Sequence, residues 1–346
     1  MRAIMRTLTM FLFLAACGSK SEAPTGGDKP ATDTTAKTEP AKPAVAALPE
    51  GRDAEAAKLV KAGAACEVKD DDISLSCPER KAAGEYAFQH QQSKEVAATC
   101  AELLRDGNTA VKLVAAHCLD RLTSVAVTPV LAHALDSLEA EKSKTVRKQF
   151  AWSIKGAEAV TAKLEDRVLA LVDKLIKADE EAAAGNVLDT LFPEYMMSSG
   201  PKPPKAAQQI VLAALKNKKG DLYIRACDKI RLVEDKAAAC KALAEAAVPE
   251  DKTDWWRAMA AFSEIKPPCV EQATTVVENV LAAGDKAIAE SPDYLGRIGE
   301  NYELTPDLRK KAAAALTKAK KVTPEWKHKR VDTAIADFTK PFEKKS

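Results

Sequence analysis

The sequence contains none of the short motifs that mark the well-known catalytic centres. Gly-x-Ser-x-Gly, His-Glu-x-x-His and phosphate-loop patterns are absent from its 346 residues. Two Ser-x-x-Lys matches, at residues 199–202 and 263–266, lack the Ser-Asp-Asn and Lys-Thr-Gly partners of that motif. These absences remove the common hydrolase signatures, and we expect a protein that is not an enzyme.

Spacings typical of metal sites are also absent. No Cys-x-x-Cys or His-x-x-x-His pattern occurs, although three histidines and two cysteines can be considered as ligands. Ordinary helical histidines are the favoured interpretation, so we predict no metal and no other cofactor. The residues in question are His90, His117, His133, Cys100 and Cys118.

Long apolar runs are missing except at the very start of the chain. The run at residues 8–16 is too short for a transmembrane helix, which needs ~20 apolar residues. Arg2 and Arg6 precede it, which is the pattern of a secretory leader. The run ends in Leu14-Ala15-Ala16-Cys17, and these four residues resemble the lipobox of bacterial lipoproteins.

This resemblance implies that residues 1–16 are a signal peptide removed by cleavage before Cys17. It also implies a diacylglyceryl group on the Cys17 sulfur and a further acyl chain, such as palmitate, on the new amino group. Two or more acyl chains together give stable membrane anchoring. No Asp follows Cys17. By resemblance to lipoprotein sorting in many Gram-negative bacteria, this implies the outer membrane, with the body facing the periplasm or the cell surface. An ordinary signal peptide with an incidental cysteine is the alternative.

The chain has no excess of either charge. Lys and Arg number 52 against 50 Asp and Glu, and removing the leader with Arg2 and Arg6 leaves 50 against 50. A nucleic-acid binder would show a basic excess or stripe, so we expect no nucleic-acid partner. Because no membrane-length apolar run follows the leader, we expect a soluble body tethered through its lipid.

The N-terminal part of the mature chain divides into two segments. Residues 17–50 are rich in Ala, Pro, Thr and Lys, which predicts a disordered linker. Residues 51–81 predict a short helix followed by a small hairpin closed by a Cys66–Cys77 disulfide, since both cysteines are symmetric about a polar turn. The aspartates at residues 70–72 lack the spaced ligands of an EF-hand, so a solvated turn is favoured over calcium binding.

From about residue 82 onward, apolar residues recur at the three- and four-residue spacing of helices. Two successive units contain a helix, a turn and a second helix that opens with an apolar–basic pair, Val111-Lys112 and then Val146-Arg147. These units resemble HEAT repeats. Further pairs occur at Ile224-Arg225 and Trp256-Arg257. A helix at 181–192, interrupted by Gly185, supplies the missing unit between Val146 and Ile224.

The resemblance implies an all-α, HEAT- or armadillo-like solenoid of about seven helical hairpins. We expect N-terminal repeats over residues 82–198 and C-terminal repeats over 205–346. The Pro-rich segment at 198–204 predicts a flexible joint between them, because proline cannot continue a helix.

Eight cysteines are present, and seven remain once Cys17 is assigned to lipid. Cys227 and Cys240 lie at similar distances from a turn on successive predicted helices, so we predict a disulfide between them. A Cys100–Cys118 pair is an open alternative to two buried thiols. The odd count leaves one thiol over, for which Cys269 is the expected candidate.

We therefore predict a membrane-anchored, non-catalytic scaffold that binds a protein or peptide along its second helices. For each cation of this surface, a contact between repeats is the favoured alternative. Adjacent helical residues diverge by ~100°, so one of Trp255 and Trp256 should pack while the other is a candidate for exposure, although burial of both is favoured. The surface residues are Lys112, Arg147, Arg225, Trp255 and Arg257.

Two other functions stay open at this point. A peptidoglycan-acting enzyme of the cell envelope could use an all-α superhelical body, and would show an acidic pair in a deep cleft. A purely structural spacer would show a uniformly charged surface without an apolar patch. The sequence leaves the partner's identity and the oligomeric state open.

Overall fold

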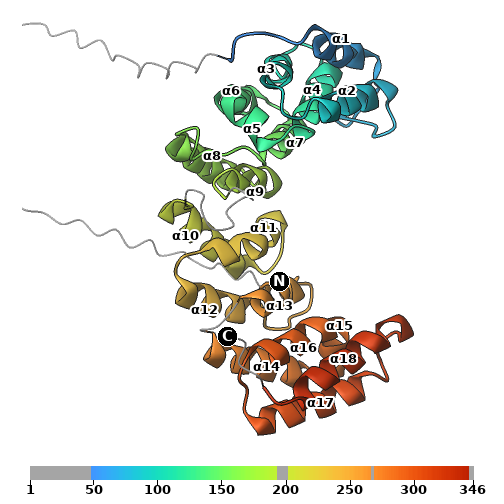
Figure 1. Ribbon diagram of the computed structural model, residues 1–346, viewed down its shortest axis with the longest axis vertical. Helices are drawn as coiled ribbons and strands as arrows, with labels where there is room; N and C mark the ends of the chain where they lie inside the picture. The colour runs from blue at the N-terminus through green and yellow to red at the C-terminus, as the bar shows by residue number, and fades with distance from the viewer. Residues whose placement is uncertain (1–47, 193–201, 266–268, 343–346) are drawn as a thin grey trace, which may run out of the picture. The chain divides into compact units, whose positions relative to one another are not determined.

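In a computed structural model, helices follow one another in pairs along the chain (Figure 1). The structure describes residues 48–192, 202–265 and 269–342, which belong to one compact unit spanning residues 45–346. The first helices of the pairs are α1 (Ala54–Ala62), α3 (Lys94–Leu103), α6 (Leu131–Ala140), α8 (Glu165–Lys177), α10 (Lys205–Ala214), α12 (Lys236–Ala246), α14 (Val270–Ala283) and α17 (Pro306–Ala319). The second helices are α2 (Pro78–Gln89), α4 (Thr109–Asp120), α7 (Lys144–Ile154), α9 (Glu181–Asp189), α11 (Asp221–Lys229), α13 (Trp255–Glu264), α16 (Pro292–Asn301) and α18 (His328–Thr339).

Short elements lie between these helices, some within a pair and some between pairs. They are α5 (Ser124–Val127), α15 (Asp285–Glu290) and the 3-10 turns η1 (Gly63–Ala65), η2 (Thr128–Val130), η3 (Leu215–Asn217), η4 (Ile230–Leu232) and η5 (Glu325–Lys327). Many helices begin at a polar residue whose side chain accepts a hydrogen bond from the first turn, which fixes where the helix starts. The capping residues are Asp53, Ser93, Asn108, Ser143, Asp235 and Thr305.

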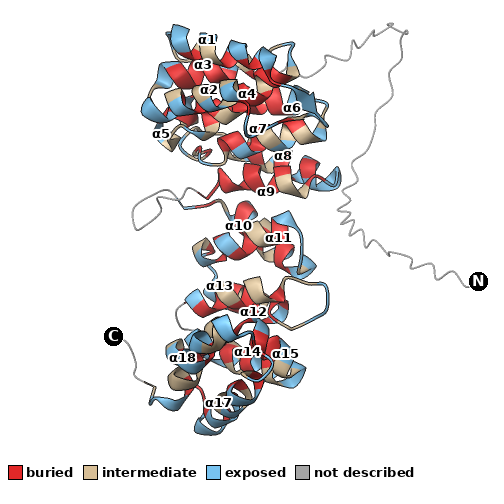
Figure 2. Ribbon diagram, turned by 90° about the vertical axis from the view of Figure 1, so that its right-hand side faces the viewer, coloured by how far each residue is buried: buried red, intermediate tan, exposed pale blue. Residues whose placement is uncertain are grey.

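Each second helix contacts the next one, from α2 to α18 without a break. The residues between them are buried, while the outer sides of the helices are exposed (Figure 2). Small buried residues such as Ala115 and Ala151 allow this close approach. Stacking buries apolar faces that a single hairpin could not cover alone. The predicted all-α solenoid is therefore confirmed.

The first helical pair was not recognised as part of this stack. Helices α1 and α2 contact each other, and they pack on α3 and α4 in the same way as later pairs. The boundary expected after residue 81 falls inside α2. The hairpins from α3 to α18 correspond to the predicted seven, and the α1–α2 pair adds one before them within the described chain.

A small antiparallel ladder is inserted between α1 and α2. Strand β1 (Val68–Lys69) pairs with β2 (Asp72–Ile73), and Asp70 and Asp71 form the turn with φ of 52° and 59°. Positive φ at both central residues is the geometry of a tight hairpin turn, which Asp tolerates better than most residues.

The structure contains the Cys66–Cys77 disulfide, the pair expected from the sequence, with Cα atoms 5.9 Å apart. The sequence predicts that the two cysteines face each other across the ladder. In the structure they do not, because the strand pairing is centred one residue earlier. Cys77 instead lies beyond the ladder as the N-cap of α2. The turn is not only solvated, since Asp71 Oδ2 accepts a 2.7 Å hydrogen bond from Ser143 Oγ.

The predicted disulfide between Cys227 and Cys240 is wrong. Cys240 on α12 is bonded to Cys269 at the start of α14, and Cys227 is buried with a free thiol. The reason lies in the stacking, because α12 contacts the next first helix, α14, whereas Cys227 lies on a second helix. Cys269 is therefore not the unpaired cysteine. Cys100 and Cys118 form the third disulfide, with Cα atoms 6.2 Å apart.

Several expectations concern residues outside the described part of the chain. In the residues that are described, no helix combines the length and the apolar character needed to cross a bilayer. Helix α9 precedes residues 193–201 in the sequence and helix α11 follows them, and the two helices contact each other. The untested expectations are those on the leader, Cys17, the linker up to residue 47, and most of the joint at 198–204.

Candidate functional site: the second-helix surface

Three of the four predicted cations are engaged in contacts between repeats. Lys112 Nζ lies 2.8 Å from Glu141 Oε2, at the end of α6 in the following pair. Arg147 on α7 donates two hydrogen bonds, of 2.8 and 2.7 Å, to the carboxylate of Glu180 at the start of α9. These contacts support the interpretation favoured from the sequence, in which each cation joins neighbouring repeats.

Arg225 on α11 completes this series in the opposite direction along the chain. Its Nη2 donates a 2.9 Å hydrogen bond to Asn186 Oδ1, and its Nη1 lies 3.3 Å from Asp189 Oδ2 on the preceding α9. Lys229 Nζ lies 3.6 Å from the other oxygen of Asp189. The two cations thus share one carboxylate, that of Asp189, which is almost fully buried.

The pKa values of these carboxyl groups reflect the pairing. Hydrogen bonds from Arg147 hold the pKa of Glu180 below its ordinary value. Burial works to raise the pKa of Glu141, but hydrogen bonds from Lys112 and from the backbone N–H groups of Ser143 and Lys142 together outweigh it and lower that pKa. Burial raises the pKa of Asp189 in spite of Lys229 and Arg225. The pairing therefore favours the charged forms of Glu180 and Glu141, whereas burial disfavours the charged form of Asp189.

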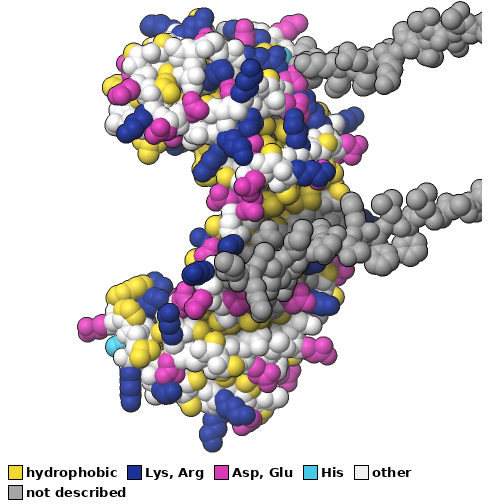
Figure 3. Space-filling view, turned by 180° about the vertical axis from the view of Figure 1, so that it is seen from behind, with side chains coloured by type: hydrophobic (Ala, Val, Ile, Leu, Met, Phe, Trp, Pro, Cys, Tyr) yellow, Lys and Arg dark blue, Asp and Glu magenta, His cyan; other side chains and the backbone are white. Residues whose placement is uncertain are grey.

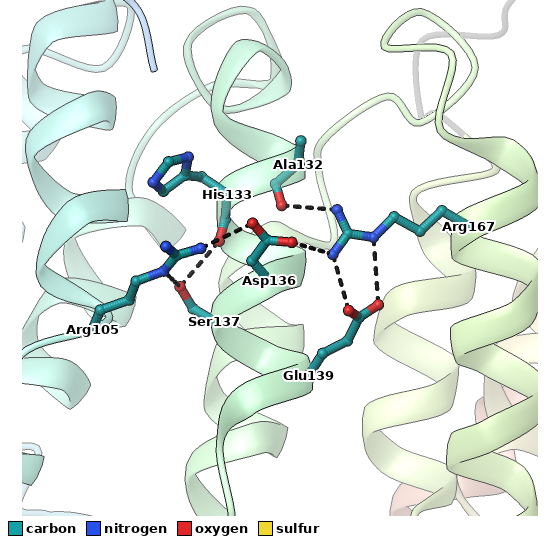
Figure 4. Close-up of polar contacts among 7 residues, drawn as sticks. All are labelled: Arg105, Ala132, His133, Asp136, Ser137, Glu139 and Arg167. Carbon is teal, nitrogen blue, oxygen red and sulfur yellow. Dashed lines mark hydrogen bonds and ion pairs between the residues drawn. The ribbon is translucent and has the colours of Figure 1, made fainter. Parts of the chain in front are cut away.

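A second network, which the sequence did not reveal, connects the first helices (Figure 4). Arg105 Nη2 lies 3.0 Å from Asp136 Oδ2, and Arg167 Nη2 lies 2.5 Å from Asp136 Oδ1. Arg167 also contacts Glu139 at 3.0 Å and donates to the carbonyl of Ala132. Helix α6 is thereby held on both sides, by Arg105 after α3 and by Arg167 from α8.

Arg257, the fourth predicted cation, has no acidic partner in the described chain. Its guanidinium carbon lies 4.6 Å from the ring centroid of Trp256, and its Nε is buried without a hydrogen-bond partner among those residues. Trp255 is 3% exposed and packs in the core, whereas Trp256 is half-buried. The two tryptophans thus diverge as adjacent helical residues do, but the favoured burial of both is not found, because Trp256 remains partly accessible.

Arg257 and Trp256 line a cleft of about 750 Å³, which we call the α11–α13 cleft. Its walls come from α11, η4 and α13, with Tyr294 from α16. The basic lining residues are Arg225, Lys229, Arg231 and Arg257, the acidic ones are Asp228 and Glu264, and the apolar ones include Ile230, Leu232, Ala260 and Ala261.

The free thiol of Cys227 also lines this cleft. Burial raises the pKa of Cys227 to about 12. The group therefore remains a protonated thiol at neutral pH, and a thiol is a poor nucleophile compared with a thiolate. Cys227 therefore has a packing role. The groups of the cleft that are suited to binding a ligand are its charged side chains and its aromatic rings.

Aromatic rings paired with cations continue from the cleft in both directions, and we call this set the aromatic–cation row. Trp152 on α7 has Lys155 Nζ 3.2 Å and Arg225 Cζ 5.6 Å from its centroid. Beyond the cleft, Arg330 on α18 lies 5.5 Å from the Trp326 ring and 3.0 Å from Asp293, the neighbour of Tyr294. The ring members are Trp152, Trp256, Tyr294 and Trp326.

Gly185 explains how Arg225 of α11 reaches Trp152 of α7 across α9. A Cβ atom at Gly185 would lie 2.9 Å from Arg225 Cγ, so a side chain there would displace Arg225. The glycine that departs from the repeat pattern is thus the position over which Arg225 passes. On the face of the molecule shown in Figure 3, basic and acidic side chains are interspersed with hydrophobic ones.

The histidines considered as metal ligands have separate surroundings. His90 Nδ1 lies 2.9 Å from the carbonyl of Tyr86, and burial lowers the pKa of His117 to about 4, helped by Arg80. In the described ranges, one grouping has metal-like spacing, Cys66 and Cys77 with Glu79, and its two sulfurs are joined in the disulfide.

Comparisons with known proteins give little further information. No protein family and no curated protein matches the sequence. One solved structure to which the chain is similar is human deoxyhypusine hydroxylase in complex with glycerol, with 15% sequence identity and a TM-score of 0.28. The match covers 82% of this chain and 97% of that one.

This comparison corrects the expectation that the chain is not an enzyme, because the solved structure it resembles is an enzyme. That expectation rested on absent motifs, and short motifs do not cover every kind of active site. A likeness at this TM-score carries no argument about a reaction, so no catalytic activity is transferred to this chain.

Proposed function

We propose that the protein is a lipid-anchored scaffold of the bacterial outer membrane that binds a protein or peptide partner in the periplasm. The lipid on Cys17 would hold it to the membrane, and the linker at 17–50 would give the body reach. The aromatic–cation row on the second helices would be the binding surface. The lipobox-like residues Leu14-Ala15-Ala16-Cys17 support the anchor.

The aromatic–cation row is the observation that carries the binding role. Trp152 is 39% exposed and Trp326 is 69% exposed, whereas half of the aromatic residues in the described chain are buried. Exposed tryptophans next to arginines are the residue types that dominate the energetics of protein interfaces. The apolar lining of the α11–α13 cleft disfavours the alternative of a uniformly charged spacer.

Photo-crosslinking in the native envelope tests this proposal. A benzophenone amino acid placed at Trp152 or at Trp326 of the full lipidated chain should capture the same partner from both positions, because both belong to one surface. Lys177 on α8 and Lys311 on α17 are exposed positions on first helices and serve as matched controls. They should capture that partner at no more than about a tenth of the yield, since only a few interface residues carry binding.

A variant in which residues 1–17 are replaced by an ordinary cleavable signal peptide without a cysteine at its cleavage site provides the second arm of this experiment. It loses its leader normally but lacks the thiol that would carry lipid, so we expect it in the soluble periplasmic fraction with the crosslink to a membrane-bound partner reduced. Equal capture from the first-helix positions would contradict the proposed surface. Retention of this variant in the membrane fraction after washing with salt would contradict the anchor.

A further inference from the structure

We infer that the α11–α13 cleft binds an acidic segment of a partner polypeptide, with a carboxylate on Arg257 and a neighbouring apolar side chain between Trp256 and Tyr294. This inference rests on the proposed function, because it assigns a ligand class to one part of the proposed surface. It goes further in naming the chemical group, the receiving residue and the place in the stack.

The contrast between Arg257 and the equivalent cations is the first argument. Lys112, Arg147 and Arg225 occupy the same repeat position and each reaches an acidic partner. Arg257 reaches none in the described chain, and its buried Nε–H has no acceptor there. A buried donor without an acceptor is unfavourable for the fold. Such violations are expected where a residue serves binding rather than stability.

The charges around the cleft give the second argument. Arg225 and Lys229 are both paired with Asp189, whose single negative charge offsets at most one of their two positive charges. Of the two acidic lining residues, Glu264 lies 3.6 Å from Arg297, and Asp228 is exposed. Arg257 and the exposed Arg231 therefore remain as positive charges without an acidic partner in the described residues, and they are complementary to an anionic ligand.

The form of Arg257 favours a carboxylate in particular. Trp256 stacks against its guanidinium, which restricts the side chain without consuming its hydrogen-bond donors. A planar guanidinium held in this way presents a fork that matches a carboxylate with two parallel hydrogen bonds. A lysine at this position would provide charge without that geometry.

The apolar part of the cleft favours a peptide over a free anion or a sugar. An isolated phosphate would gain nothing from contact with the apolar side chains of Ile230, Leu232 and Ala261. A peptide with an apolar side chain next to an acidic one could bury that apolar side chain against them. One face of the Trp256 ring already carries Arg257, and Arg297 lies 5.9 Å from the Tyr294 ring, so the rings are less open to stacking on a sugar. A volume of about 750 Å³ suits a short segment rather than a folded domain.

Fluorescence anisotropy with the full chain tests the inference. The probe is a fluorescein-labelled peptide, Gly-Ser-Glu-Phe-Glu-Leu-Glu-Ser, and its counterpart has Gln in place of each Glu. We expect the acidic peptide to bind, and the Arg257→Gln variant to weaken its Kd at least about tenfold. The Gln peptide should bind the native chain at least about tenfold more weakly, because it offers no carboxylate.

Arg52→Gln is the matched control, since Arg52 is an exposed arginine paired with Glu102, outside both the cleft and the aromatic–cation row. It should change the Kd by less than about twofold, because it touches no part of the ligand. Ala261→Leu, which narrows the cleft and leaves Arg257 in place, should also weaken binding and guards against misfolding of the Arg257 variant. Arg257→Gln should not lower the thermal unfolding midpoint by more than Arg52→Gln does, because Arg257 has no ion pair in the described chain to lose.

Three results would overturn the inference. They are equal binding of the acidic and Gln peptides, equal binding by the native chain and both cleft variants, or displacement of the peptide by inorganic phosphate or by anionic phospholipid vesicles at a lower concentration than unlabelled peptide requires. If the crosslinks from Trp152 and Trp326 still capture one partner, the proposed function stands without this ligand. If those crosslinks fail as well, the proposed function falls with it.

Discussion

Replacing both Cys240 and Cys269 by Ala is expected to lower the free energy of unfolding by about 3–4 kcal/mol. Their disulfide joins residues with a sequence separation of 29, and closing a loop of that length restricts the unfolded chain. Its ends lie on α12 and at the start of α14, so it also ties two neighbouring first helices together. Urea unfolding under oxidising conditions, followed by circular dichroism, measures the loss.

Cys227→Ala is the matched control for this experiment, because Cys227 is a buried cysteine that forms no disulfide in the described chain. Removing its sulfur should cost about 1 kcal/mol, the value for a small buried apolar group. Mass mapping of the native chain should recover a linked Cys240–Cys269 peptide. A linked Cys227–Cys240 peptide would instead restore the pairing expected from the sequence and refute the one described above.

The positions of the second helices could be predicted because their signal is local. An apolar–basic pair lies near the start of α4, α7 and α11, and a polar residue caps α4 and α7. Helix periodicity and caps depend on residues close in sequence, so they can be read without knowing the fold. The α1–α2 pair was missed because the β1–β2 ladder separates its helices and hides the repeat spacing.

The disulfide partners of Cys227 and Cys240 could not be predicted in the same way. Equal distance from a turn suggests contact only if both helices belong to one hairpin. Cys227 lies on the second helix of one pair and Cys240 on the first helix of the next, where stacking brings α14 close. The partner was therefore set by long-range packing. The Arg105–Asp136–Arg167 network depends on the same packing and left no local signal.

The four cations of the repeat pattern show how identical local signals can lead to different surroundings. Lys112 and Arg147 find an acidic residue in the following pair, and Arg225 finds one on the preceding α9. Arg257 occupies the same repeat position but meets the aromatic ring of Trp256 and a cleft. The pattern predicts where a cation lies, whereas the neighbouring helix decides whether that cation supports the fold or is available to a ligand.

Replacing Arg147 by Met should destabilise the chain by about 3 kcal/mol at pH 7. The Met side chain retains apolar volume but cannot donate the two hydrogen bonds that Glu180 accepts from Arg147. The side chain of Glu180 is only 6% exposed, so its carboxylate would lose its partner while most of it remains shielded from water. Removing one partner of a buried pair costs much more than the pair itself contributes.

The cost of Arg147→Met should depend on pH in a defined direction. In the native chain Arg147 holds the pKa of Glu180 below its ordinary value. A group with a lowered folded-state pKa contributes stability above its unfolded pKa of ~4.3, and that contribution is lost as the pH falls through the folded-state pKa. In the variant, burial without a partner raises this pKa instead. The difference in stability between native chain and variant should therefore begin to narrow as the pH falls through the raised pKa of Glu180 in the variant, above ~4.3, and should stop narrowing once the pH is below the lowered pKa in the native chain.

Two further variants show whether the buried carboxylate causes this loss. Arg147→Met combined with Glu180→Gln removes both charges and should be at least about 1 kcal/mol more stable than Arg147→Met alone. Arg52→Met breaks the exposed pair with Glu102 and should cost less than about 1 kcal/mol at any pH. If Arg147→Met cost no more than Arg52→Met, the cations at this repeat position would not hold the repeats together. The contrast between Arg147 and Arg257 would then carry no information about binding.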